Sequence, residues 1–307
     1  MATGETTEGR LRRRFDFGEA VTRTVLVGSA LITLLITVGI VFFFINESIL
    51  FFRNPGFSFR EFFGTTTWQP AAGTFGVLPL LNATLMTVGV GLLFAAPTGL
   101  AAAVYLHEYA PARLRAFLKP ALEVLSSIPT VVYGYFALYQ VTPLLRSIFG
   151  SDVVEVYNTF SAGIVLGVLI MPLIITLSEE ALSSVPTYAK EAPYGVGATK
   201  IEALFKVSLP AAAPGIISAL VVAMSRAVGE SIIVSLAAGS GPILTFDPFR
   251  AAETMTGYIL RIARGEFSYG TIDYTSIFAI GLILFLLTFG LNVASLVIAR
   301  RSHRSYE

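Results

Sequence analysis

Long apolar runs separated by charged loops dominate this sequence. Each run approaches or exceeds about 20 residues, the length that an α-helix needs to cross the hydrocarbon core of a bilayer. The runs predict six transmembrane helices, over residues 25–45, 79–106, 120–149, 160–178, 209–239 and 277–299. The first run, from Val25 to Ile45, carries no charge and has no small-residue cleavage pattern, so we interpret it as a retained helix and not as a signal peptide. The predicted fold class is an all-α polytopic membrane protein.

Composition narrows the classes of function. Of the 307 residues, 54% are hydrophobic and 13% are charged, whereas a soluble domain is about 25% charged. The absence of cysteine excludes thiol catalysis, thiolate metal sites and disulfides. The net charge of +1 argues against nucleic-acid binding. These numbers favour a membrane protein whose charged residues act locally.

The positions of Lys and Arg orient the predicted helices. If the N-terminus is cytoplasmic, 14 of the 21 basic residues fall in cytoplasmic segments and six fall on the opposite side. This excess predicts that both termini are cytoplasmic, as an even number of crossings requires. We interpret residues 1–24 as a basic cytoplasmic segment in which Arg10, Arg12, Arg13 and Arg14 anchor the topology, with partner binding as the alternative. Residues 300–307 form the predicted cytoplasmic tail.

Two predicted extracytoplasmic loops are too long to be simple turns. In residues 46–76, aromatic residues from Phe51 to Trp68 are interleaved with charged ones, a pattern typical of a segment at the lipid–water interface. In residues 240–276, Met255, Ile259 and Ile262 are at helical spacing and predict a short amphipathic helix. For both loops, a docking surface for an external partner is the alternative to interfacial packing.

Three ionisable residues, Glu123, Arg226 and Glu230, lie within predicted crossings. A charge in the bilayer centre costs about 2.5–3.5 kcal/mol on insertion scales, so each needs a partner, a polar cavity or a function. Arg226 and Glu230 are four residues apart and can pair on one helix face. Since a guanidinium offers a fork of donors that suits an oxyanion, we expect Arg226 and Glu230 to line a substrate pathway, with a buried structural ion pair as the alternative. Glu123 lies nearer a helix end and can reach toward Lys119.

A second group of polar residues surrounds Pro129. A proline inside a membrane helix frees a backbone carbonyl, which hydroxyls, water or a neighbouring helix must satisfy. Ser127, Thr130 and Tyr133 are therefore candidates to line a polar passage. The alternative is a kinked helix whose freed carbonyl is satisfied by its own hydroxyls.

The predicted cytoplasmic loop 179–208 carries a recognisable pattern. Glu191 and Ala192 are followed by Gly197 and then by Leu209-Pro210 at the start of the next crossing, although Pro193 stands at the third motif position. This pattern resembles the EAA loop of ABC-transporter permease subunits, which couples the permease to its ATPase.

Such a loop can form two short helices around Gly195 and Gly197 that present an apolar face to a groove of the partner. The face would carry Ile201, Leu204 and Phe205. The residues that the resemblance assigns to ATPase coupling are Glu191, Ala192, Gly195, Gly197, Leu204, Leu209 and Pro210. Without the resemblance, the segment would be an amphipathic connector.

Nothing in the sequence indicates an enzyme. The string from Gly195 to Lys200 lacks the spacing of a phosphate-binding loop, and His107 and His303 belong to no zinc motif. We therefore expect a transporter subunit with no metal and no cofactor of its own. The energy source must then be another chain or an ion gradient, and the resemblance to ABC permeases implies that ATP and Mg²⁺ bind to a separate ATPase chain.

The resemblance extends over most of residues 20–307. Ile128–Gly134, Lys190–Pro210, Arg226–Ser231 and the final crossing are similar to the phosphate-specific ABC permease family of the PstC type, although the paralogous PstA type shares the loop and an Arg-Ala-x-Gly-Glu string. The resemblance implies a MetI-like permease core over residues 77–299 in a bacterial or archaeal inner membrane. It also implies four partners: a PstA-type permease, a PstB-type ATPase dimer, a PstS-type extracytoplasmic phosphate-binding protein and phosphate itself. The family's intramembrane Arg and Glu match Arg226 and Glu230, and Ser231 stands where Thr is common. Two alternatives stay open: an ABC permease for sulfate or molybdate, and a secondary transporter that uses the Arg226 and Glu230 pair as a relay.

Overall fold

The computed structural model describes residues 17–265 and 270–303. The predicted basic cluster from Arg10 to Arg14 and the end of the predicted tail lie outside the described residues. Two units form the chain, one up to Asn46 and one from Glu47 onward. The first unit holds most of helix α1 (Phe17–Phe52), whose stretch from Val25 to Ile45 carries no charge and is long and apolar enough to cross a membrane.

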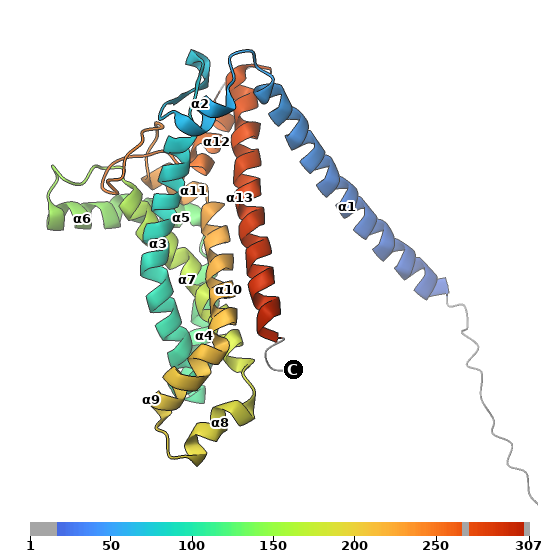
Figure 1. Cartoon of the computed structure of the whole chain (residues 1–307), viewed down its shortest axis with the longest axis vertical. Coiled ribbons are helices and arrows are strands. Elements are labelled where there is room, and N and C mark those ends of the chain that lie inside the picture. Colours follow the sequence, from blue (N-terminus) through green and yellow to red (C-terminus); the bar gives the residue numbers. More distant parts are fainter. Residues whose placement is uncertain (1–16, 266–269, 304–307) are drawn as a thin grey trace, which may run out of the picture. The chain divides into compact units, whose positions relative to one another are not determined.

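The second unit is almost entirely helical (Figure 1). The end of this unit that is predicted to be extracytoplasmic contains α2 (Phe59–Gly64), a hairpin of β1 (Trp68–Gln69) and β2 (Thr74–Phe75) joined by η1 (Pro70–Ala72), and α12 (Met255–Arg264). The long helices are α3 (Leu78–Val104), α7 (Thr159–Ser183), α10 (Leu209–Val228) and α13 (Ile272–His303). The shorter helices are α4 (Ala112–Ser127), α5 (Thr130–Phe136), α6 (Thr142–Phe149), α8 (Thr187–Gly195), α9 (Lys200–Ala203) and α11 (Ile232–Ala237). A single π-helical turn follows each of three helices: η2 (Tyr105–Tyr109) follows α3, η3 (Ala137–Val141) follows α5, and η4 (Leu204–Ser208) follows α9.

Five of the described helices are long and apolar enough to cross a membrane, and a bent pair makes a sixth. The five match five of the predicted crossings. The third predicted crossing, over residues 120–149, is wrong as a single helix, because α4 and the helix that begins with α5 meet at 86°. Ile128 and Pro129 leave helical geometry between them, since Pro129 has no N–H to continue the ladder.

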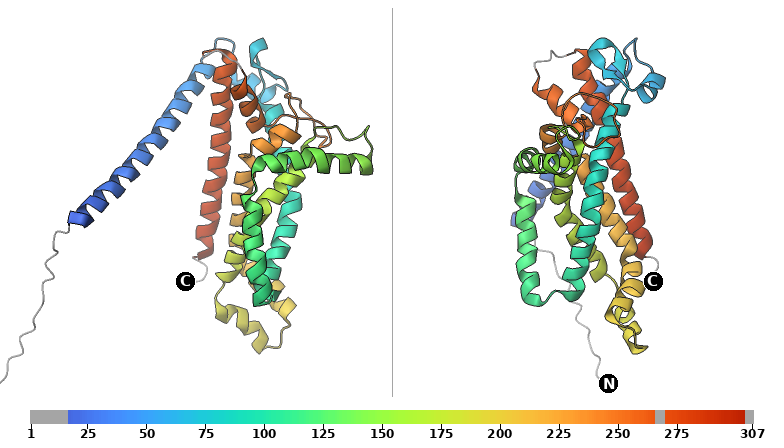
Figure 2. Two further views of the ribbon diagram at one scale, coloured as in Figure 1. Left: turned by 180° about the vertical axis from the view of Figure 1, so that it is seen from behind. Right: turned by 90° about the vertical axis from the view of Figure 1, so that its left-hand side faces the viewer.

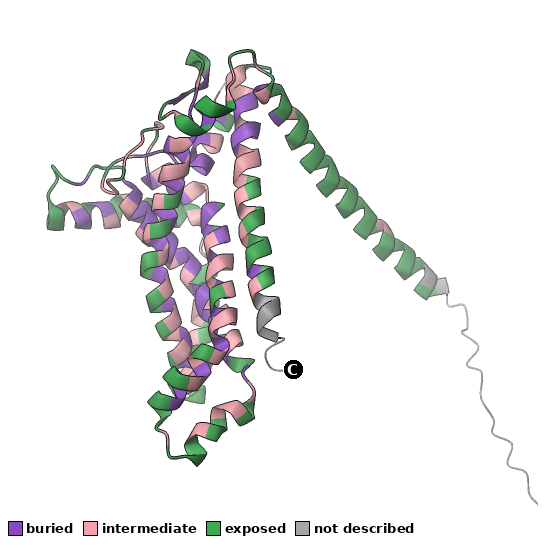
Figure 3. Ribbon diagram, in the orientation of Figure 1, coloured by how far each residue is buried: buried purple, intermediate pink, exposed green. Residues whose placement is uncertain are grey.

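Helices α3, α7, α10 and α13 lie side by side, with α7 the most enclosed (Figures 1 and 2). Their facing sides are buried and their outer sides are exposed (Figure 3). Glycines allow α3 and α7 to approach closely: a Cβ added to Gly167 would lie 2.7 Å from the Gly91 carbonyl oxygen. Between α10 and α13, the Ser218 and Ser295 hydroxyls are hydrogen-bonded at 2.6 Å. Small and hydroxyl residues therefore hold this bundle together, as expected where the solvent is lipid.

The aromatic residues of segment 46–76 form a core of their own. Phe51, Phe62, Trp68 and Phe75 are at most 2% exposed and pack with α12 and the start of α13. These four rings face the protein interior, because the hairpin and α2 fold them against each other, and the position of the segment at the lipid–water interface stays a prediction. Phe59 and the neighbouring Phe63 remain exposed.

The amphipathic helix predicted in residues 240–276 is confirmed as α12. Met255 and Ile262 on its inner face are buried in the aromatic core, while Arg261 points outward enough to be 45% exposed. Helices α8 and α9 lie at the opposite end of the second unit from α2 and α12 (Figures 1 and 2). The two loop regions that the sequence singles out are thus on opposite ends of the bundle.

Candidate functional site

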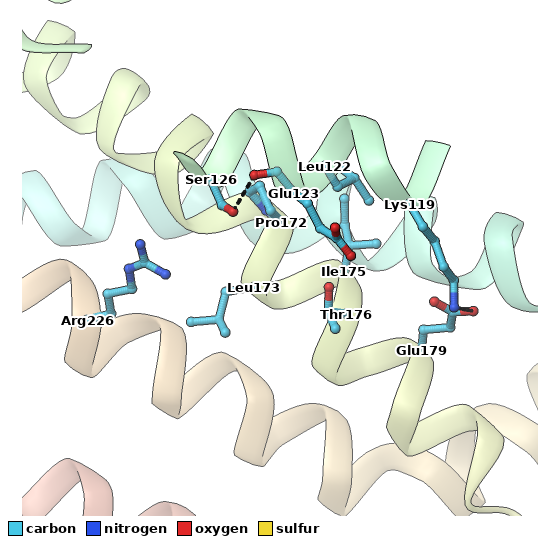
Figure 4. A pocket seen from close by; sticks show the side chains of 10 residues that line it. All are labelled: Lys119, Leu122, Glu123, Ser126, Pro172, Leu173, Ile175, Thr176, Glu179 and Arg226. Carbon is cyan, nitrogen blue, oxygen red and sulfur yellow. Dashed lines mark hydrogen bonds and ion pairs between the residues drawn. The ribbon is translucent and has the colours of Figure 1, made fainter. Parts of the chain in front are cut away.

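A cavity of about 350 Å³ lies where α4, α7 and α10 converge (Figure 4). It contains two cations, two carboxylates and two hydroxyls within an otherwise apolar bundle. Its lining residues are Lys119, Leu122, Glu123, Ser126, Pro172, Leu173, Ile175, Thr176, Glu179 and Arg226. Two of the three ionisable residues that the sequence places within crossings, Glu123 and Arg226, are brought together here.

Arg226 lies in the last turn of α10 and points toward the cavity (Figure 4). No hydrogen bond or ion pair joins its side chain to any residue that the structure describes. A guanidinium stays charged even when buried, so this side chain is a cation with its full set of donors available. It is suited to bind an oxyanion.

The predicted pairing of Arg226 with Glu230 is wrong. Helix α10 ends at Val228, so residues 226 and 230 do not share a helix face. The Glu230 carboxylate instead accepts backbone hydrogen bonds from Ile232 at 3.0 Å and Ile233 at 3.4 Å, at the start of α11. Glu230 therefore stabilises the N-terminus of the next helix, where a negative charge is favourable.

Lys119 does not pair with Glu123, contrary to the expectation from sequence. Its ammonium lies 3.0 Å from the carboxylate of Glu179 on α7, a residue that the sequence analysis did not single out. The Glu179 side chain is 11% exposed, and the Lys119 side chain is 49% exposed. Glu123 makes no ion pair with any described residue, and its carboxylate points into the middle of the cavity (Figure 4).

The hydroxyls around Pro129 satisfy the helix break. The Tyr133 hydroxyl donates to the Leu125 carbonyl at 2.7 Å, the carbonyl that residue 129 would bond to if it were not proline. The Ser127 hydroxyl donates to the Glu123 carbonyl at 2.7 Å, and Thr130 begins α5. These contacts match the alternative of a kinked helix satisfied by its own hydroxyls. Among these polar residues, it is Ser126 that reaches the cavity.

The predicted coupling loop contains the two expected short helices, α8 and α9. Gly195 ends α8, and Gly197 has a φ of +86°, a conformation that glycine adopts without strain. Thr199 then starts α9 with a capping box, in which its hydroxyl and backbone N–H exchange hydrogen bonds with Glu202. The glycine turn and the cap together set the angle between the two helices.

The exposed face of this loop differs in one residue from the prediction. Ile201 and Phe205 are 61% and 64% exposed, as a docking face requires, and Glu191 and Ala192 on α8 are also exposed. Leu204 is 4% exposed, so its assignment to the docking face is wrong. The π-helical turn η4 shifts the helical register at this point and directs Leu204 into the bundle.

His107 connects the coupling loop to the membrane helices. Its two ring nitrogens lie 3.2 Å from the Ser183 hydroxyl at the end of α7 and 3.2 Å from the Lys190 ammonium on α8. Lys200 on α9 also reaches back, donating to the Glu108 carbonyl and lying 4.4 Å from the centre of the Tyr109 ring. Burial lowers the pKa of Lys190, while the Glu108 carboxylate acts in the opposite direction. The sequence excluded His107 from zinc binding and gave no hint of this junction.

An ion pair with a buried carboxylate lies at the α12 end of the second unit. Glu253, whose side chain is 1% exposed, accepts two hydrogen bonds from the Arg261 guanidinium at 2.5 and 3.0 Å. These bonds raise the pKa of Arg261. A second cavity, of about 550 Å³, opens beside Arg261 and Trp68. Docking of an external partner at this end stays a prediction.

Comparison with known protein families shows which family this chain belongs to. Residues 95–304, which include the cavity and the coupling loop, match the family described as the binding-protein-dependent transport system inner membrane component. The chain belongs to this family. The membership confirms the resemblance of the loop to that of ABC permeases, and it decides against a secondary transporter.

The sequences of several curated relatives align with most of this permease. It is 32% identical to the probable ABC transporter permease protein YqgH of Bacillus subtilis, over 91% of this chain and 90% of that protein. It is 27% identical to the phosphate transport system permease protein PstC of Mesorhizobium japonicum, over 90% and 88% of the two chains. A probable PstC of Methanocaldococcus jannaschii is 28% identical, over 78% and 82%.

Solved structures confirm the fold class, a MetI-like permease. The permease resembles an inward-facing MetNI methionine ABC transporter, with a TM-score of 0.53 and 22% identity over 74% of this chain and 94% of that one. It also resembles a bacterial ABC transporter that imports alginate, with a TM-score of 0.59 and 17% identity over 91% and 98%. The chain is thus a multi-pass permease subunit of an ABC importer, not an enzyme, and it works with an ATPase and a substrate-binding protein.

Proposed function

We propose that this permease subunit forms half of the pathway of an ATP-driven importer of inorganic phosphate. The observation that supports this most directly is the guanidinium of Arg226, which lies in a cavity between α4, α7 and α10 without a partner among the described residues. Arg226 is exposed on this subunit, and since a cation that faced lipid at this position would be costly, we infer that it faces a polar pathway. The relatives named phosphate transport system permease, which align over most of this chain, support phosphate as the oxyanion.

Alternating access is the proposed mechanism. ATP-driven closure of the ATPase dimer opens the pathway outward, and the binding protein delivers phosphate toward Arg226. The guanidinium replaces part of the hydration shell of the anion with two parallel hydrogen bonds. Glu230 does not compete for the guanidinium, because its carboxylate is engaged at the start of α11.

Coupling to the ATPase takes place at α8 and α9. The exposed Ile201 and Phe205 dock into a groove of the ATPase, and Glu191, Ala192, Gly195, Gly197, Leu209 and Pro210 shape or adjoin this surface. ATP and Mg²⁺ bind to that partner, and this chain needs no cofactor.

The proposed assembly is of the phosphate-specific type. It contains a PstA-type second permease, two PstB-type ATPase subunits and a PstS-type binding protein in the cytoplasmic membrane of a bacterium or archaeon. The PstC names of the relatives support this assignment.

The proposal is tested by uptake of radiolabelled phosphate in cells that lack their own high-affinity system. The chain is expressed with its partner subunits, and uptake is measured with excess sulfate or molybdate as competitor. Phosphate uptake that requires the chain and resists both competitors supports the proposal. Uptake of sulfate or molybdate instead of phosphate would show that the importer serves another oxyanion.

Arg226 is tested in the same cells. We expect Arg226→Gln to lower phosphate uptake by about 100-fold or more, because a charged donor to the anion is lost, while the assembled complex is recovered in normal amounts. Arg226→Lys, which keeps the charge without the fork, should retain an intermediate rate. Wild-type uptake by Arg226→Gln would remove this residue from the pathway.

A further inference from the structure

The cavity that holds Arg226 has a second cation at its other end. Lys119 and Ser126 are seven residues apart on α4, and Pro172 and Glu179 are seven residues apart on α7, and all four line the cavity. At 1.5 Å per residue, the cavity spans about 10 Å along both helices. Figure 4 shows Arg226 beyond the Ser126 end and Lys119 at the Glu179 end. A single small anion cannot touch both cations at once, so it would have to pass from one to the other, and the Glu123 carboxylate between them repels it from the middle of the cavity toward either cation.

The Lys119 end of the cavity faces the coupling loop. Glu179 is one helical turn before Ser183, where α7 ends and the chain continues into α8. Arg226 is 17 residues beyond the start of α10, about 25 Å from the coupling-loop end of that helix. An anion that moves from Arg226 to Lys119 therefore travels toward the side on which the ATPase docks, which is the direction of import.

The surroundings of Lys119 allow an anion to bind there and to dissociate again. An ammonium has three donors, so Lys119 can keep its contact with Glu179 and still donate to an anion. Its side chain is 49% exposed, which leaves room for that second contact. The Glu179 carboxylate lies 3.0 Å from the ammonium and repels an anion bound there, so the anion is held weakly. Conduction requires such a balance between binding and release.

We propose that Lys119 is the second anion-binding residue of the pathway, and that Glu179 orients its ammonium and weakens its hold so that phosphate is released to the cytoplasm. The proposal rests on the proposed function, because it takes the anion at Arg226 to be the transported one. It adds an exit site formed by α4 and α7 to the site formed by α10.

Uptake kinetics test the proposal in the assembled transporter. Lys119→Gln should lower the maximal rate of phosphate uptake about tenfold or more, with an apparent KM within about twofold of wild type, because entry at Arg226 is unchanged. Lys119→Arg should retain most of the rate. Arg113→Gln, which removes an exposed cation from the same helix outside the cavity, is the matched control and should be neutral. Wild-type uptake by Lys119→Gln would overturn the exit site while leaving phosphate import intact.

A second variant separates anion binding from a structural role. If the Lys119–Glu179 pair only holds α4 against α7, the double variant Lys119→Gln/Glu179→Gln replaces it with a neutral hydrogen-bonded pair and should restore transport. If Lys119 binds the anion, the double variant should assemble normally and stay about tenfold slow. Restored transport in the double variant would overturn the proposal.

The lack of cysteine in this chain permits a chemical rescue. Lys119→Cys in the Glu179→Gln background, with cysteine-free partner subunits in proteoliposomes, carries a single thiol. A methanethiosulfonate that adds an ethylammonium should restore phosphate transport, and one that adds an ethylsulfonate should not. Since no ion pair with Glu179 exists in this background, rescue reports a cation that acts on the anion. Equal effects of the two reagents would contradict the proposal, and a wild-type transporter that takes sulfate or molybdate instead of phosphate would overturn the proposed substrate separately.

Discussion

The close contact between α3 and α7 makes the stability of the permease sensitive to a single methyl group. A Cβ at position 167 would lie 2.7 Å from the Gly91 carbonyl oxygen and 3.2 Å from the Phe94 ring, whereas ordinary contacts are at 3.4–4 Å. The helices would have to separate by about 1 Å, which forfeits up to about half of the dispersion energy of each contact along the interface. Overpacking of this kind costs about 1–3 kcal/mol, against a gain of up to about 1 kcal/mol in helix propensity. The gain in helix propensity is shared by any Gly→Ala change in a helix interior, so we expect Gly167→Ala to be less stable by about 1–3 kcal/mol than a Gly→Ala variant without close contacts.

Thermal unfolding of the detergent-solubilised protein measures this effect. Gly89→Ala on α3 is the matched control, because nothing lies within 4 Å of a Cβ added there. Gly167→Ala should lower the Tm by about 2–6 °C relative to Gly89→Ala. It should also slow transport, because α7 carries Thr176 and Glu179 into the cavity. Equal melting temperatures for the two variants would refute the argument that glycines set the distance between these helices.

Three further predictions concern the ends and the break of the bundle. Gly197→Val should introduce about 1–3 kcal/mol of backbone strain, because Gly197 has a φ of +86°. In proteoliposomes, this variant should raise the amount of ATP hydrolysed per phosphate transported. Gly197→Asn should have a smaller effect, because Asn tolerates this backbone region. Arg261→Gln should lower stability by about 2–4 kcal/mol, since it leaves the buried Glu253 carboxylate without its cation, and Glu253→Gln in the same chain should recover part of the lost Tm. Tyr133→Phe should cost about 0.5–2 kcal/mol in chemical unfolding, because the Leu125 carbonyl then keeps only a long hydrogen bond of 3.4 Å from the Ile128 N–H. An unchanged free energy of unfolding would mean that the Tyr133 hydroxyl does not stabilise the break.

Much of the fold can be predicted, because the bilayer imposes a simple rule on the sequence of a membrane-spanning helix. Each crossing must be a run of apolar residues long enough to span the bilayer, so the sequence predicts five long helices at the right places. The bounds differ most for α1, which extends beyond 25–45 at both ends, and for the predicted crossing 209–239, which ends as α10 at Val228. The break at Pro129 was recognised as a kink, but its angle of 86° was not. That angle depends on residues after the break, among them Tyr133, whose hydroxyl bonds back to α4.

The site was only partly predictable, because spacing rules assume that a helix continues. Arg226 was identified by its charge in an apolar run, but the end of α10 at Val228 separates it from Glu230. Glu179 was missed because it lies one residue past the predicted crossing 160–178, and its partner Lys119 is 60 positions away in the chain. His107 was missed for a similar reason, since its contacts with Ser183 and Lys190 arise only when three helix ends meet.

The coupling loop and the substrate cavity share one continuous helix. Residues Lys200–Val228, comprising α9, η4 and α10, run without a break from the exposed docking residues to Arg226. From Lys200 to Arg226 this helix is about 39 Å long. A tilt of about 5° at the Lys200 end of a helix of that length displaces the guanidinium by about 3 Å, which is the length of a hydrogen bond. In the proposed mechanism, a small rotation at the ATPase would therefore be enough to make or break the contact of Arg226 with its anion, without any rearrangement inside the helix itself.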